Sequence, residues 1–438
     1  MQAVIMAGGK GTRLASLTKG EIPKPMIPVL EKPLLLWQIE QLKENGITDI
    51  IMIIGHLGNK IYEFFGDGSK YGVSIQYIEE KEPLGTAGAF YFLKDLLKDN
   101  YFLLVFGDVF FNIDIARMEQ YHIEKQSIAT LFVHPNGHPF DSDLVTLDAD
   151  GQVYGFDSKH NIRDYWYDNC VNAGFYMLNK DICDLLQEPV KTDLEKDILQ
   201  PLIQQGKAVF GYRSPEYIKD VGTVERIEKT IEDIKNGFIE GKCLKQKQKC
   251  LFLDRDGTIN QHKGLIYKEE DFILEDCALE AIRLINESGY LGIIVTNQPV
   301  VARGLCEIDD VQNIHKKMTT LLGKEGIFLD DILFCPHHPD KGYPEENPLY
   351  KIPCDCRKPG TGMIEEAVHR YHIDIEKSWM IGDTTIDIQT GKNAGLKTAL
   401  VLTGEAGNDK KYEVEPDIKS KNLLEAVKVI LKDLEKEN

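Results

Sequence analysis

Long hydrophobic runs are missing from this 438-residue chain. No apolar segment reaches the roughly 18–20 residues that a membrane-spanning helix needs. The first residues, MQAVIMAGGKG, also lack the basic stretch that opens a secretory signal peptide. The sequence therefore predicts a cytoplasmic protein that does not act on or in a membrane.

Cysteine is scarce, and acidic residues outnumber basic ones. Nine cysteines are too few for a disulfide scaffold, and in the cytoplasm they should be reduced. The 51 basic residues stand against 70 acidic ones, which gives a formal net charge of −19. Such a surface disfavours nucleic acid and anionic membranes as partners. It still permits a small anionic substrate that is held by local cations or by a metal ion.

No short-period repeat or low-complexity tract is present, and the hydrophobic share of 42% is that of a globular protein. At roughly 100–200 residues per domain, the length predicts two domains. Strand-like runs at 2–6, 49–54, 73–78 and 101–106 alternate with helical patterns, and the alternation resumes after residue 249. This order predicts an α/β fold of two doubly wound domains with mostly parallel sheets. The lysine-rich segment 241–249 indicates the boundary, so we expect domains at 1–238 and 249–438 and a linker at 239–248.

A glycine-rich turn follows the first strand-like run. It contains Gly8, Gly9 and Gly11, followed by Thr12 and Arg13. Clustered glycines after a strand allow backbone N–H groups to turn toward an anion such as a phosphate. Taken alone, the three glycines are equally compatible with an ordinary turn between a strand and a helix.

Further sequence motifs favour phosphate binding over an ordinary turn. Pro23-Lys24-Pro25-Met26 lies a short loop after the glycines, and with it the turn resembles the sugar-1-phosphate nucleotidyltransferase family. The resemblance extends from Met1 to about Gly237. The other matching stretches are G-T-A-G at 85–88, F-G-D at 106–108, V-N-A-G at 171–174, K-D-V-G-T at 219–223 and, in place of F-x-E-K-P, F-D-S-K at 156–159.

The resemblance implies a Rossmann-like domain in which a sugar 1-phosphate attacks the α-phosphorus of a nucleoside triphosphate and pyrophosphate leaves. Such a transfer depends on cations and positioning more than on a nucleophilic side chain. The family pattern implies Mg²⁺ on Asp108 and Asp220. It places Arg13 on the pyrophosphate, Lys24 on the α-phosphate and Lys159 on the sugar phosphate. The implied nucleotide and sugar contacts are Gly8, Gly9, Gly11, Thr12, Gly85, Thr86, Gly88, Asn172 and Gly174.

Two carboxylates follow the first apolar run after residue 249, in the sequence Asp254-Arg255-Asp256-Gly257-Thr258. Where a strand ends, the chain leaves the sheet, so both carboxylates can face one crevice. One carboxylate can attack phosphorus, and the other can act as acid for the leaving alcohol and then as base for water. Thr296-Asn297, Arg357-Lys358 and Asp383 follow in order and offer polar, cationic and metal-binding groups.

Together these motifs resemble the haloacid-dehalogenase (HAD) superfamily over roughly residues 249–438. The resemblance implies that Asp254 is the nucleophile, Asp256 the acid and base, and Lys358 the group that stabilises the phosphoaspartate. It implies Mg²⁺ on Asp254, Asp383 and the backbone carbonyl of Asp256. The implied phosphate and substrate contacts are Thr296, Asn297, Arg303 and Arg357.

Four soft or borderline metal ligands bracket a proline- and glycine-containing loop at 335–356. They are Cys335, His337, Cys354 and Cys356, with His338 as an alternative to His337. Such a set suits a tetrahedral structural Zn²⁺, because four protein ligands leave no open position. In a reducing compartment a metal site is favoured over a disulfide, and inert reduced thiols are the competing interpretation.

Zinc-loop phosphatases of this kind include the D,D-heptose 1,7-bisphosphate 7-phosphatases, which the second block resembles closely, and the histidinol-phosphatases. The two blocks together predict a bifunctional enzyme. It removes the 7-phosphate of a heptose 1,7-bisphosphate and transfers a nucleotidyl group, GMP from GTP, to heptose 1-phosphate for surface glycans. One alternative is a mannose-1-phosphate or other hexose-1-phosphate nucleotidyltransferase fused to a histidinol-phosphatase-like domain. Another is a regulatory protein with one inactive domain. A homo-oligomer is compatible with either.

Overall fold

The computed structural model describes residues 1–9 and 20–437, with side chains up to residue 432. The chain forms two compact units. The first contains residues 1–134, 143–158 and 170–245, and the second contains 135–142, 159–169 and 246–438. Two short excursions from the N-terminal half of the sequence therefore pack with the C-terminal half. The segment 239–248, which the sequence predicts as a linker, begins with part of helix α7 (Phe238–Lys242) and buries Ile239 and Leu244.

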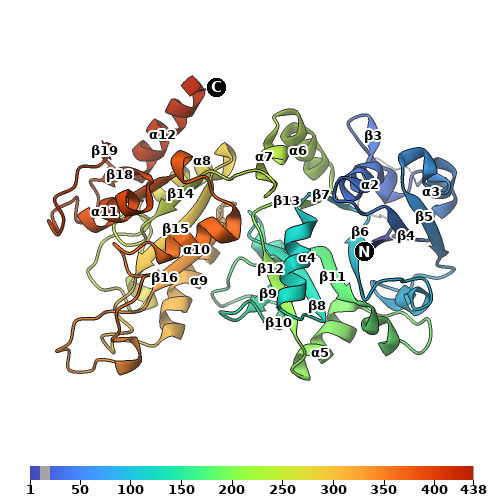
Figure 1. The fold of residues 1–438 in the computed structure, drawn as a ribbon, viewed down its shortest axis with the longest axis horizontal. Helices are drawn as coiled ribbons and strands as arrows, with labels where there is room; N and C mark the ends of the chain where they lie inside the picture. The colour runs from blue at the N-terminus through green and yellow to red at the C-terminus, as the bar shows by residue number, and fades with distance from the viewer. Residues whose placement is uncertain (10–19, 438) are drawn as a thin grey trace. The chain divides into compact units, whose positions relative to one another are not determined.

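Parallel strands form one half of the main sheet in the first unit (Figure 1). They are β1 (Gln2–Met6), β4 (Asp49–Ile54), β5 (Ser74–Glu79) and β6 (Tyr101–Phe106), in the order β6-β1-β4-β5. The apolar runs of β1, β4 and β6 are buried on both faces, as expected for a sheet that is covered by helices, whereas the edge strand β5 also carries exposed polar residues. The strand–helix alternation predicts this half.

The other half of that sheet contains antiparallel pairs, which the alternation does not predict. Strand β11 (Val171–Asn179) runs antiparallel to β6 and to β8 (Ala129–His134). Strands β9 (Leu144–Leu147), β10 (Val153–Asp157) and β12 (Val209–Arg213) complete it. A separate antiparallel pair joins β7 (Val109–Asn112) to β13 (Tyr217–Asp220).

Helices and short turns occupy the remainder of the first unit. The segment 86–97, where the sequence predicts a helical pattern, contains a 3-10 helix rather than an α-helix. The elements not yet given are η2 (Lys24–Met26), β2 (Pro28–Val29), β3 (Lys32–Pro33), α2 (Leu34–Glu44), α3 (Gly58–Phe65), η3 (Ser69–Tyr71), η4 (Gly88–Leu93), α4 (Ile115–Glu124), η6 (Lys180–Leu185), the π-helix η7 (Leu194–Leu199), α5 (Gln200–Gln204) and α6 (Val224–Lys235).

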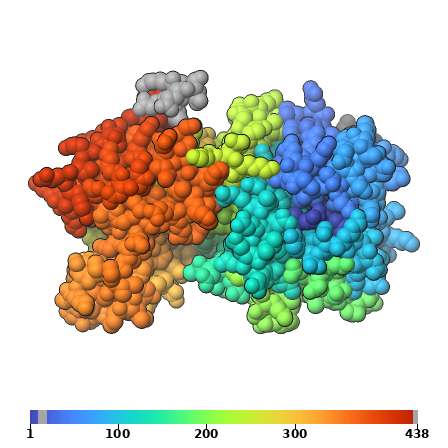
Figure 2. Space-filling model, in the orientation of Figure 1, coloured from blue at the N-terminus to red at the C-terminus, as the bar shows by residue number. Residues whose placement is uncertain are grey.

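The second unit is built on a parallel sheet in the order β16-β15-β14-β17-β18-β19. Helices α8, α9 and α12 contribute to the core on one face, and α10 to the core on the other, so this unit is doubly wound as predicted. In the space-filling view β14 and β15 are largely hidden, consistent with their buried residues (Figure 2). The elements are β14 (Cys250–Leu253), η8 (Glu269–Asp271), α8 (Ala278–Ser288), β15 (Leu291–Asn297), α9 (Ile308–Lys324), β16 (Asp331–Cys335), η9 (Pro348–Tyr350), α10 (Gly362–Tyr371), η10 (Ile375–Lys377), β17 (Trp379–Gly382), α11 (Thr385–Ala394), β18 (Lys397–Val401), β19 (Ile418–Ser420) and α12 (Leu423–Glu437).

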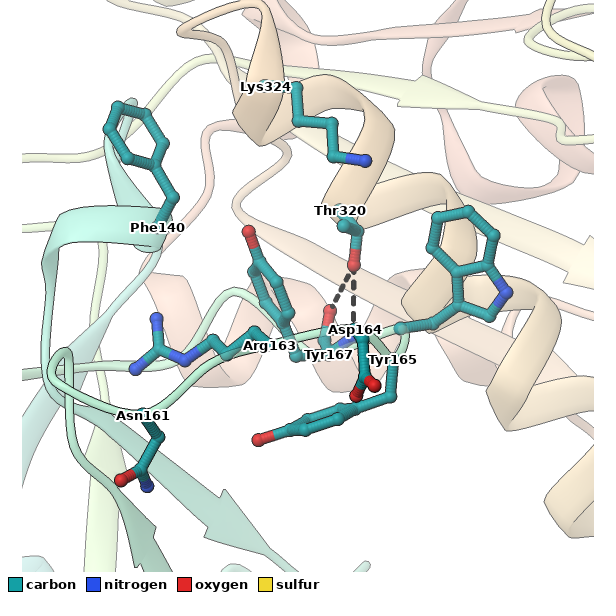
Figure 3. Close-up of a pocket in the computed structure, with 9 residues that line it drawn as sticks. Phe140, Asn161, Arg163, Asp164, Tyr165, Tyr167, Thr320 and Lys324 are labelled. Atoms are coloured by element: carbon teal, nitrogen blue, oxygen red, sulfur yellow. Dashed lines mark hydrogen bonds between the residues drawn. The ribbon is translucent and has the colours of Figure 1, made fainter.

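The two excursions pack on α9. The hydroxyl of Thr320 accepts a hydrogen bond from the backbone N–H of Tyr167 at 2.9 Å and donates to its carbonyl at 3.0 Å (Figure 3). The Thr319 hydroxyl also donates to that carbonyl, at 2.9 Å. The other excursion carries η5 (Pro139–Asp141), and a Cβ at Gly323 would lie 2.5 Å from the ring of Pro139. Small and hydroxyl-bearing residues on α9 therefore admit the backbone of the excursions.

Beside this contact lies a pocket of about 370 Å³ (Figure 3). Its lining combines aromatic rings with cations and contains none of the site residues that the sequence predicts. The lining residues are Phe140, Asn161, Arg163, Asp164, Tyr165, Trp166, Tyr167, Thr320 and Lys324. Among the helices that the structure describes, none has both the length and the apolar character needed to cross a membrane.

Candidate active sites and metal centre

Two carboxylates and a lysine converge at the carboxyl end of β6 in the first unit. Asp108 follows β6 directly, and the pairing of β13 with β7 places Asp220 opposite Val109. Lys24 forms an ion pair with Asp108. A Cβ built at Gly222 would lie 2.6 Å from Asp220 Oδ1 and 3.3 Å from Lys24 Nζ, so both predicted metal ligands face the same lysine.

Neighbouring side chains hold this arrangement in place. Gln38 in α2 donates to the carbonyls of Phe106 and Val109, at 2.9 and 2.6 Å, and so braces the turn that presents Asp108. Arg226 in α6 forms an ion pair with Asp220. The sequence analysis missed both residues. For Gln38 the signal was available, because this amide sits on the buried face of an otherwise apolar helix pattern.

The donor set suits Mg²⁺ during nucleotidyl transfer. Mg²⁺ is commonly held by one or two carboxylates together with substrate phosphates, and Asp108 and Asp220 provide such a pair. Each carboxylate is paired with a cation in the structure, so the negative charge of both is already compensated.

The glycine-rich turn is described only in part. A Cβ at Gly8 would lie 2.8 Å from Glu80 Oε2, so this glycine permits close packing against a carboxyl group. Burial raises the pKa of Glu80. Gly9 has open space at its Cβ position. The predicted residues Gly11, Thr12 and Arg13 lie outside the described residues.

Three of the predicted nucleotide and sugar contacts, Gly85, Thr86 and Gly88, lie in a loop that packs against the start of η7. Gly85 and Gly88 approach the backbone of Thr192 and Val190 so closely that a Cβ at either position would overlap it. The Thr86 hydroxyl accepts a hydrogen bond from the N–H of Leu194 at 2.7 Å. In the structure these three predicted contacts therefore join the 84–88 loop to the 190–194 segment.

The V-N-A-G stretch at 171–174 lies at the start of β11. It contains the predicted contacts Asn172 and Gly174 and is called the sugar turn below. Asn172 donates through Nδ2 to the hydroxyl of Tyr176 at 2.8 Å and to Glu195 Oε1 at 3.2 Å. Gly174 has a φ of +70°, and a Cβ there would lie 3.0 Å from the Phe106 ring. This contact places the sugar turn next to the strand that ends at Asp108. Sequence analysis did not identify Glu195.

Lys159 is not brought into this group. It is the first residue of the excursion 159–169, which belongs to the second compact unit. Its predicted contact with a sugar phosphate remains a prediction.

Three carboxylates meet one lysine in the second unit. Asp254 and Asp383 follow β14 and β17, which are neighbouring parallel strands, and Asp387 lies in the first turn of α11. Their oxygens lie within 4.8 Å of one another. Lys358 Nζ donates to Asp254 at 2.8 Å and to Asp387 at 2.6 Å. The carboxyl ends of adjacent parallel strands create this crevice.

The three carboxylates of this group carry more negative charge than Lys358 alone can compensate. Burial raises the pKa of Asp254 to about 6, against the opposing effect of Lys358. Burial, with the charges of Asp254 and Asp387, raises the pKa of Asp383 to about 8. Asp383 Oδ1 is buried and has no hydrogen-bond partner among the described residues. A divalent ion at this oxygen would compensate the excess negative charge, so these residues suit Mg²⁺.

Asp256 has a different environment from Asp254. Its carboxylate accepts hydrogen bonds from Arg255 at 2.9 and 3.0 Å, from Gln298 at 2.8 Å and from Asn260 at 3.0 Å. Burial acts to raise the pKa of Asp256, but these three donors together hold it below its ordinary value. The pKa values of the two aspartates are thus shifted in opposite directions, and Asp256 is the one that is kept ionised.

The other predicted phosphate contacts contribute to this site in several ways. The Thr296 hydroxyl accepts from Gln298 at 3.0 Å, beside Asp256. The Asn297 side chain accepts from the N–H of Lys358 at 2.9 Å and donates to its carbonyl at 3.1 Å, so it fixes the backbone of Lys358. Arg357 donates to the carbonyl of His337 at 3.1 Å.

Arg303 lies in a cationic cluster that sequence analysis recognised only in part. Its guanidinium is 4.5 Å from the ring centre of Tyr343, and the Lys351 ammonium is 4.8 Å from the same ring. Lys351 Nζ and Arg303 Nε are buried without a hydrogen-bond partner among the described residues, although Lys351 also forms an ion pair with Glu346 at 3.5 Å. Two incompletely satisfied cations side by side can accept an anionic group of a ligand.

The four predicted zinc ligands converge as well. The sulfur atoms of Cys335, Cys354 and Cys356 are 3.1–3.5 Å apart, and His337 Nδ1 lies 3.3 Å from Cys356 Sγ. A tetrahedral zinc with Zn–S bonds of about 2.3 Å separates its ligands by about 3.8 Å. Hydrogen bonding from Cys335 lowers the pKa of the Cys356 thiol to about 5. The hydrogen bond with Cys356 raises the pKa of the Cys335 thiol, and burial raises the pKa of the Cys354 thiol. The convergence of the four ligands suits Zn²⁺, and His337 rather than His338 belongs to the group.

Comparison with known proteins agrees with the two resemblances. The model of the Nucleotidyl transferase family matches residues 2–237, and that of the HAD-hydrolase-like family matches residues 355–426. The D-glycero-D-manno-heptose-1,7-bisphosphate 7-phosphatase of Chlorobaculum tepidum is 37% identical over 190 residues, which are 42% of this chain and 94% of the relative. The mannose-1-phosphate guanylyltransferase of Mycobacterium tuberculosis is 29% identical over 246 residues, 56% of this chain and 67% of the relative. Among solved structures, HddC from Yersinia pseudotuberculosis is 25% identical with a TM-score of 0.47, covering 53% of this chain and 99% of that one.

The chain belongs to the nucleotidyl transferase family, and its C-terminal part belongs to the HAD-like phosphatases. It is an enzyme with a nucleotidyltransferase unit and a phosphatase unit, which confirms both families, the fold class and the two reaction types predicted from sequence.

Proposed function

We propose that the phosphatase unit removes the 7-phosphate of D-glycero-D-manno-heptose 1,7-bisphosphate and that the transferase unit then joins GMP from GTP to the heptose 1-phosphate. The products would be GDP-heptose and pyrophosphate. One observation carries the proposal: one chain combines a unit 37% identical to a heptose-bisphosphate 7-phosphatase with a unit 29% identical to a mannose-1-phosphate guanylyltransferase. The first reaction would make the acceptor of the second. Use of a nucleoside triphosphate and reduced thiols suits the cytoplasm, and a product of this kind suits surface-glycan synthesis.

In the phosphatase unit, Asp254 is the proposed nucleophile. One of its oxygens attacks phosphorus, the bond to the sugar oxygen breaks, and a phosphoaspartate forms. Lys358 lies 2.8 Å from Asp254 Oδ1 and can neutralise charge on the transferring phosphoryl group. Mg²⁺ held by Asp254 and Asp383 would stabilise negative charge on the same oxygens. Asp387 keeps the lysine in place from the opposite side.

Asp256 is the proposed proton-transfer group. In its ionised state it can take a proton from the water that hydrolyses the phosphoaspartate. Donation to the leaving sugar oxygen requires a proton on Asp256, and the negative charge of an incoming phosphate raises its pKa toward that state. Arg255 and Gln298 fix the orientation of the carboxylate for both steps.

The cluster of Arg303, Lys351 and Tyr343 supports a substrate with a second phosphate. A monophosphate would need only the group around Asp254 and Lys358, whereas a bisphosphate brings another anion for the buried nitrogens of Arg303 and Lys351. A histidinol phosphate would instead place a cationic amine among cations, which is unfavourable. This contrast favours the heptose bisphosphate over the histidinol-phosphatase alternative.

In the transferase unit, Lys24 is proposed to contact the α-phosphate, with Asp108 and Asp220 as metal ligands. Lys24 can neutralise the negative charge that builds on the phosphoryl oxygens as the sugar phosphate attacks and pyrophosphate departs. Asp108 and Asp220 would hold Mg²⁺, which would supply positive charge to stabilise the phosphoryl oxygens during transfer. Arg13 is proposed to hold the leaving pyrophosphate, and the loops at 85–88 and 171–174 to contact the base and sugar.

Zinc is proposed to support the phosphatase from a distance. Cys356 directly precedes Arg357 and Lys358, and Arg357 donates to the carbonyl of His337. A closed four-ligand zinc site would therefore anchor the loop that carries the catalytic lysine.

The test is to offer heptose 1,7-bisphosphate with GTP, ATP, CTP or UTP in turn and to identify the products by mass spectrometry. We expect phosphate release without nucleotide, and GDP-heptose with GTP. The Asp254→Asn variant should stop phosphate release but still form pyrophosphate when heptose 1-phosphate is supplied. Turnover of mannose 1-phosphate and histidinol phosphate, with none of the heptose substrates, would overturn the proposal in favour of the alternative.

A further inference from the structure

A chain of hydrogen bonds links Asn172, Tyr176 and Glu195 in the transferase unit. The Tyr176 hydroxyl donates to Glu195 Oε1. Asn172 Nδ2 donates to the Tyr176 oxygen at 2.8 Å and to the same Glu195 oxygen at 3.2 Å. Tyr176 is completely buried, whereas Asn172 and Glu195 are partly exposed. The network therefore connects the interior with the open side of the sugar turn.

The direction of these hydrogen bonds is dictated by Glu195. Burial acts to raise the pKa of Glu195, and the hydrogen bond from Tyr176 opposes this shift. In its ionised form the carboxylate can only accept hydrogen bonds. The Tyr176 proton is therefore directed to Glu195, and the Asn172 amide must turn its NH₂ group toward the pair. Its Oδ1 atom then faces the other way, where the N–H of Gly174 approaches at 3.4 Å. This orientation leaves Oδ1 able to accept a further hydrogen bond.

Glu195 is itself held by the neighbouring loop. Ala87 N donates to the Thr192 carbonyl at 3.1 Å, and Thr192 N donates to the Leu84 carbonyl at 2.9 Å. With the Thr86–Leu194 hydrogen bond, these contacts tie the start of η7 to the 84–88 loop. Glu195 thus joins two loops that are proposed to bind the base and the sugar.

We propose that Glu195 is a positioning residue that fixes Asn172 as a hydrogen-bond acceptor, so that the transferase selects a sugar 1-phosphate with a donating hydroxyl at that point. The inference rests on the proposed function in one respect, the contact of Asn172 with the sugar. It goes beyond that function because it assigns Glu195 a role and states which way the selecting hydrogen bond runs.

The test compares Glu195→Gln with the wild-type chain. A glutamine can donate as well as accept, so the Asn172 amide is released to rotate and to present its NH₂ group to the sugar. We expect the KM for the sugar 1-phosphate to rise about tenfold, the size of one hydrogen bond, with little change in kcat or in the KM for the nucleotide. Glu188→Gln, at an exposed glutamate in the same region, is the matched control and should match wild type.

Sugar analogues reveal the direction of the hydrogen bond. The sugar is whichever 1-phosphate the wild-type enzyme turns over, tested as deoxy and deoxyfluoro derivatives at each non-anomeric position. Fluorine accepts weakly but cannot donate. At the selected position, wild type should lose about tenfold in kcat/KM with either derivative. The Glu195→Gln variant should recover activity with the fluoro derivative relative to the deoxy one.

Three results would overturn the inference. In the first, Glu195→Gln keeps the wild-type KM for sugar. In the second, it raises the KM for sugar and nucleotide alike and lowers Tm, which is loss of structure only. Adding Glu195→Gln to Asn172→Ala should have no further effect, and an undiminished effect there would also contradict it. Failure of the proposed function appears separately, as absence of turnover of heptose 1-phosphate by the wild-type enzyme.

Discussion

Lys358 Nζ lies 2.8 Å from Asp254 Oδ1, and this contact joins the loop after Cys356 to the end of strand β14. The lysine is buried and also donates to Asp387 at 2.6 Å. Without it, Asp254, Asp383 and Asp387 would share a buried crevice with no cationic side chain of the described residues bonded to them. The contact therefore serves both the stability of the site and the proposed charge neutralisation during phosphoryl transfer.

Replacement of Lys358 by methionine should lower the phosphatase kcat by at least about a hundredfold, since one preorganised charged donor near the reacting oxygens is worth that much. Phosphate release from the bisphosphate measures the effect. Nucleotidyl transfer from a supplied sugar 1-phosphate should continue at the wild-type rate. Lys377→Met, at an exposed lysine, is the control. A Lys358→Met enzyme that retained most of its kcat would show that this lysine does not act on the phosphoryl group.

Removal of a zinc ligand should damage one activity and spare the other. Cys354→Ala or Cys356→Ala should abolish bound zinc, expected at about one ion per chain, and loosen the loop that carries Lys358. A displacement of about 1 Å can cost on the order of a hundredfold in rate, so phosphatase kcat should fall by about that factor. Elemental analysis and the two activity assays check this. Cys277→Ala, a partly buried cysteine outside the cluster, should leave zinc and both activities intact.

Absence of zinc from freshly reduced wild-type protein would remove the structural-metal proposal. Equal loss of both activities in the cysteine variants would indicate general unfolding rather than loss of the loop.

Glu216 should make the stability of the transferase unit depend on pH. Burial raises the pKa of Glu216 to about 7, while the N–H groups of Asp114 and Leu244 and the Ser214 hydroxyl donate to it. Because the folded pKa lies above the ordinary value of 4.5, its contribution is fully present below about pH 4.5 and is lost as pH rises through 7. Between these limits the free energy of unfolding should fall by about 3 kcal/mol.

The comparison is Glu216→Gln, which keeps an accepting oxygen for the two N–H groups but cannot ionise. Denaturant unfolding of both proteins between pH 5 and 8 should show a smaller pH dependence for the variant. Parallel curves for the two proteins would show that Glu216 does not titrate in this range.

The hydroxyl of Thr320 should hold the 159–169 excursion to α9. Thr320→Val removes both hydrogen bonds to Tyr167 and leaves its backbone N–H without that acceptor, at a cost of about 1–3 kcal/mol. Amide exchange in residues 159–169 should become faster in the full-length variant. Thr320→Ser keeps the hydroxyl and should restore slow exchange. Unchanged exchange in the valine variant would show that other contacts hold the excursion.

The motifs and the apolar runs were enough to predict the two reaction types and the parallel strands. Asp254, Asp383 and Thr296 could be predicted as neighbours because they follow buried apolar runs, and parallel strands bring such ends to one edge. The zinc ligands were predictable for a related reason, since C-x-H and C-x-C spacings restrict the ligands within each pair. The converging Asp108 and Asp220 came from family motifs rather than from spacing.

Residues whose side chains hold other site residues in place could be found only in the three-dimensional structure. Gln38, Glu195, Gln298 and Lys351 carry no local signature of function, because their roles depend on groups that lie far away in the sequence. The antiparallel half of the first sheet and the packing of 135–142 and 159–169 on α9 depend on long-range contacts in the same way. Local periodicity reports which face of a segment is apolar, but which surface covers that face is decided when distant segments compete to bury it and to satisfy their backbone hydrogen bonds.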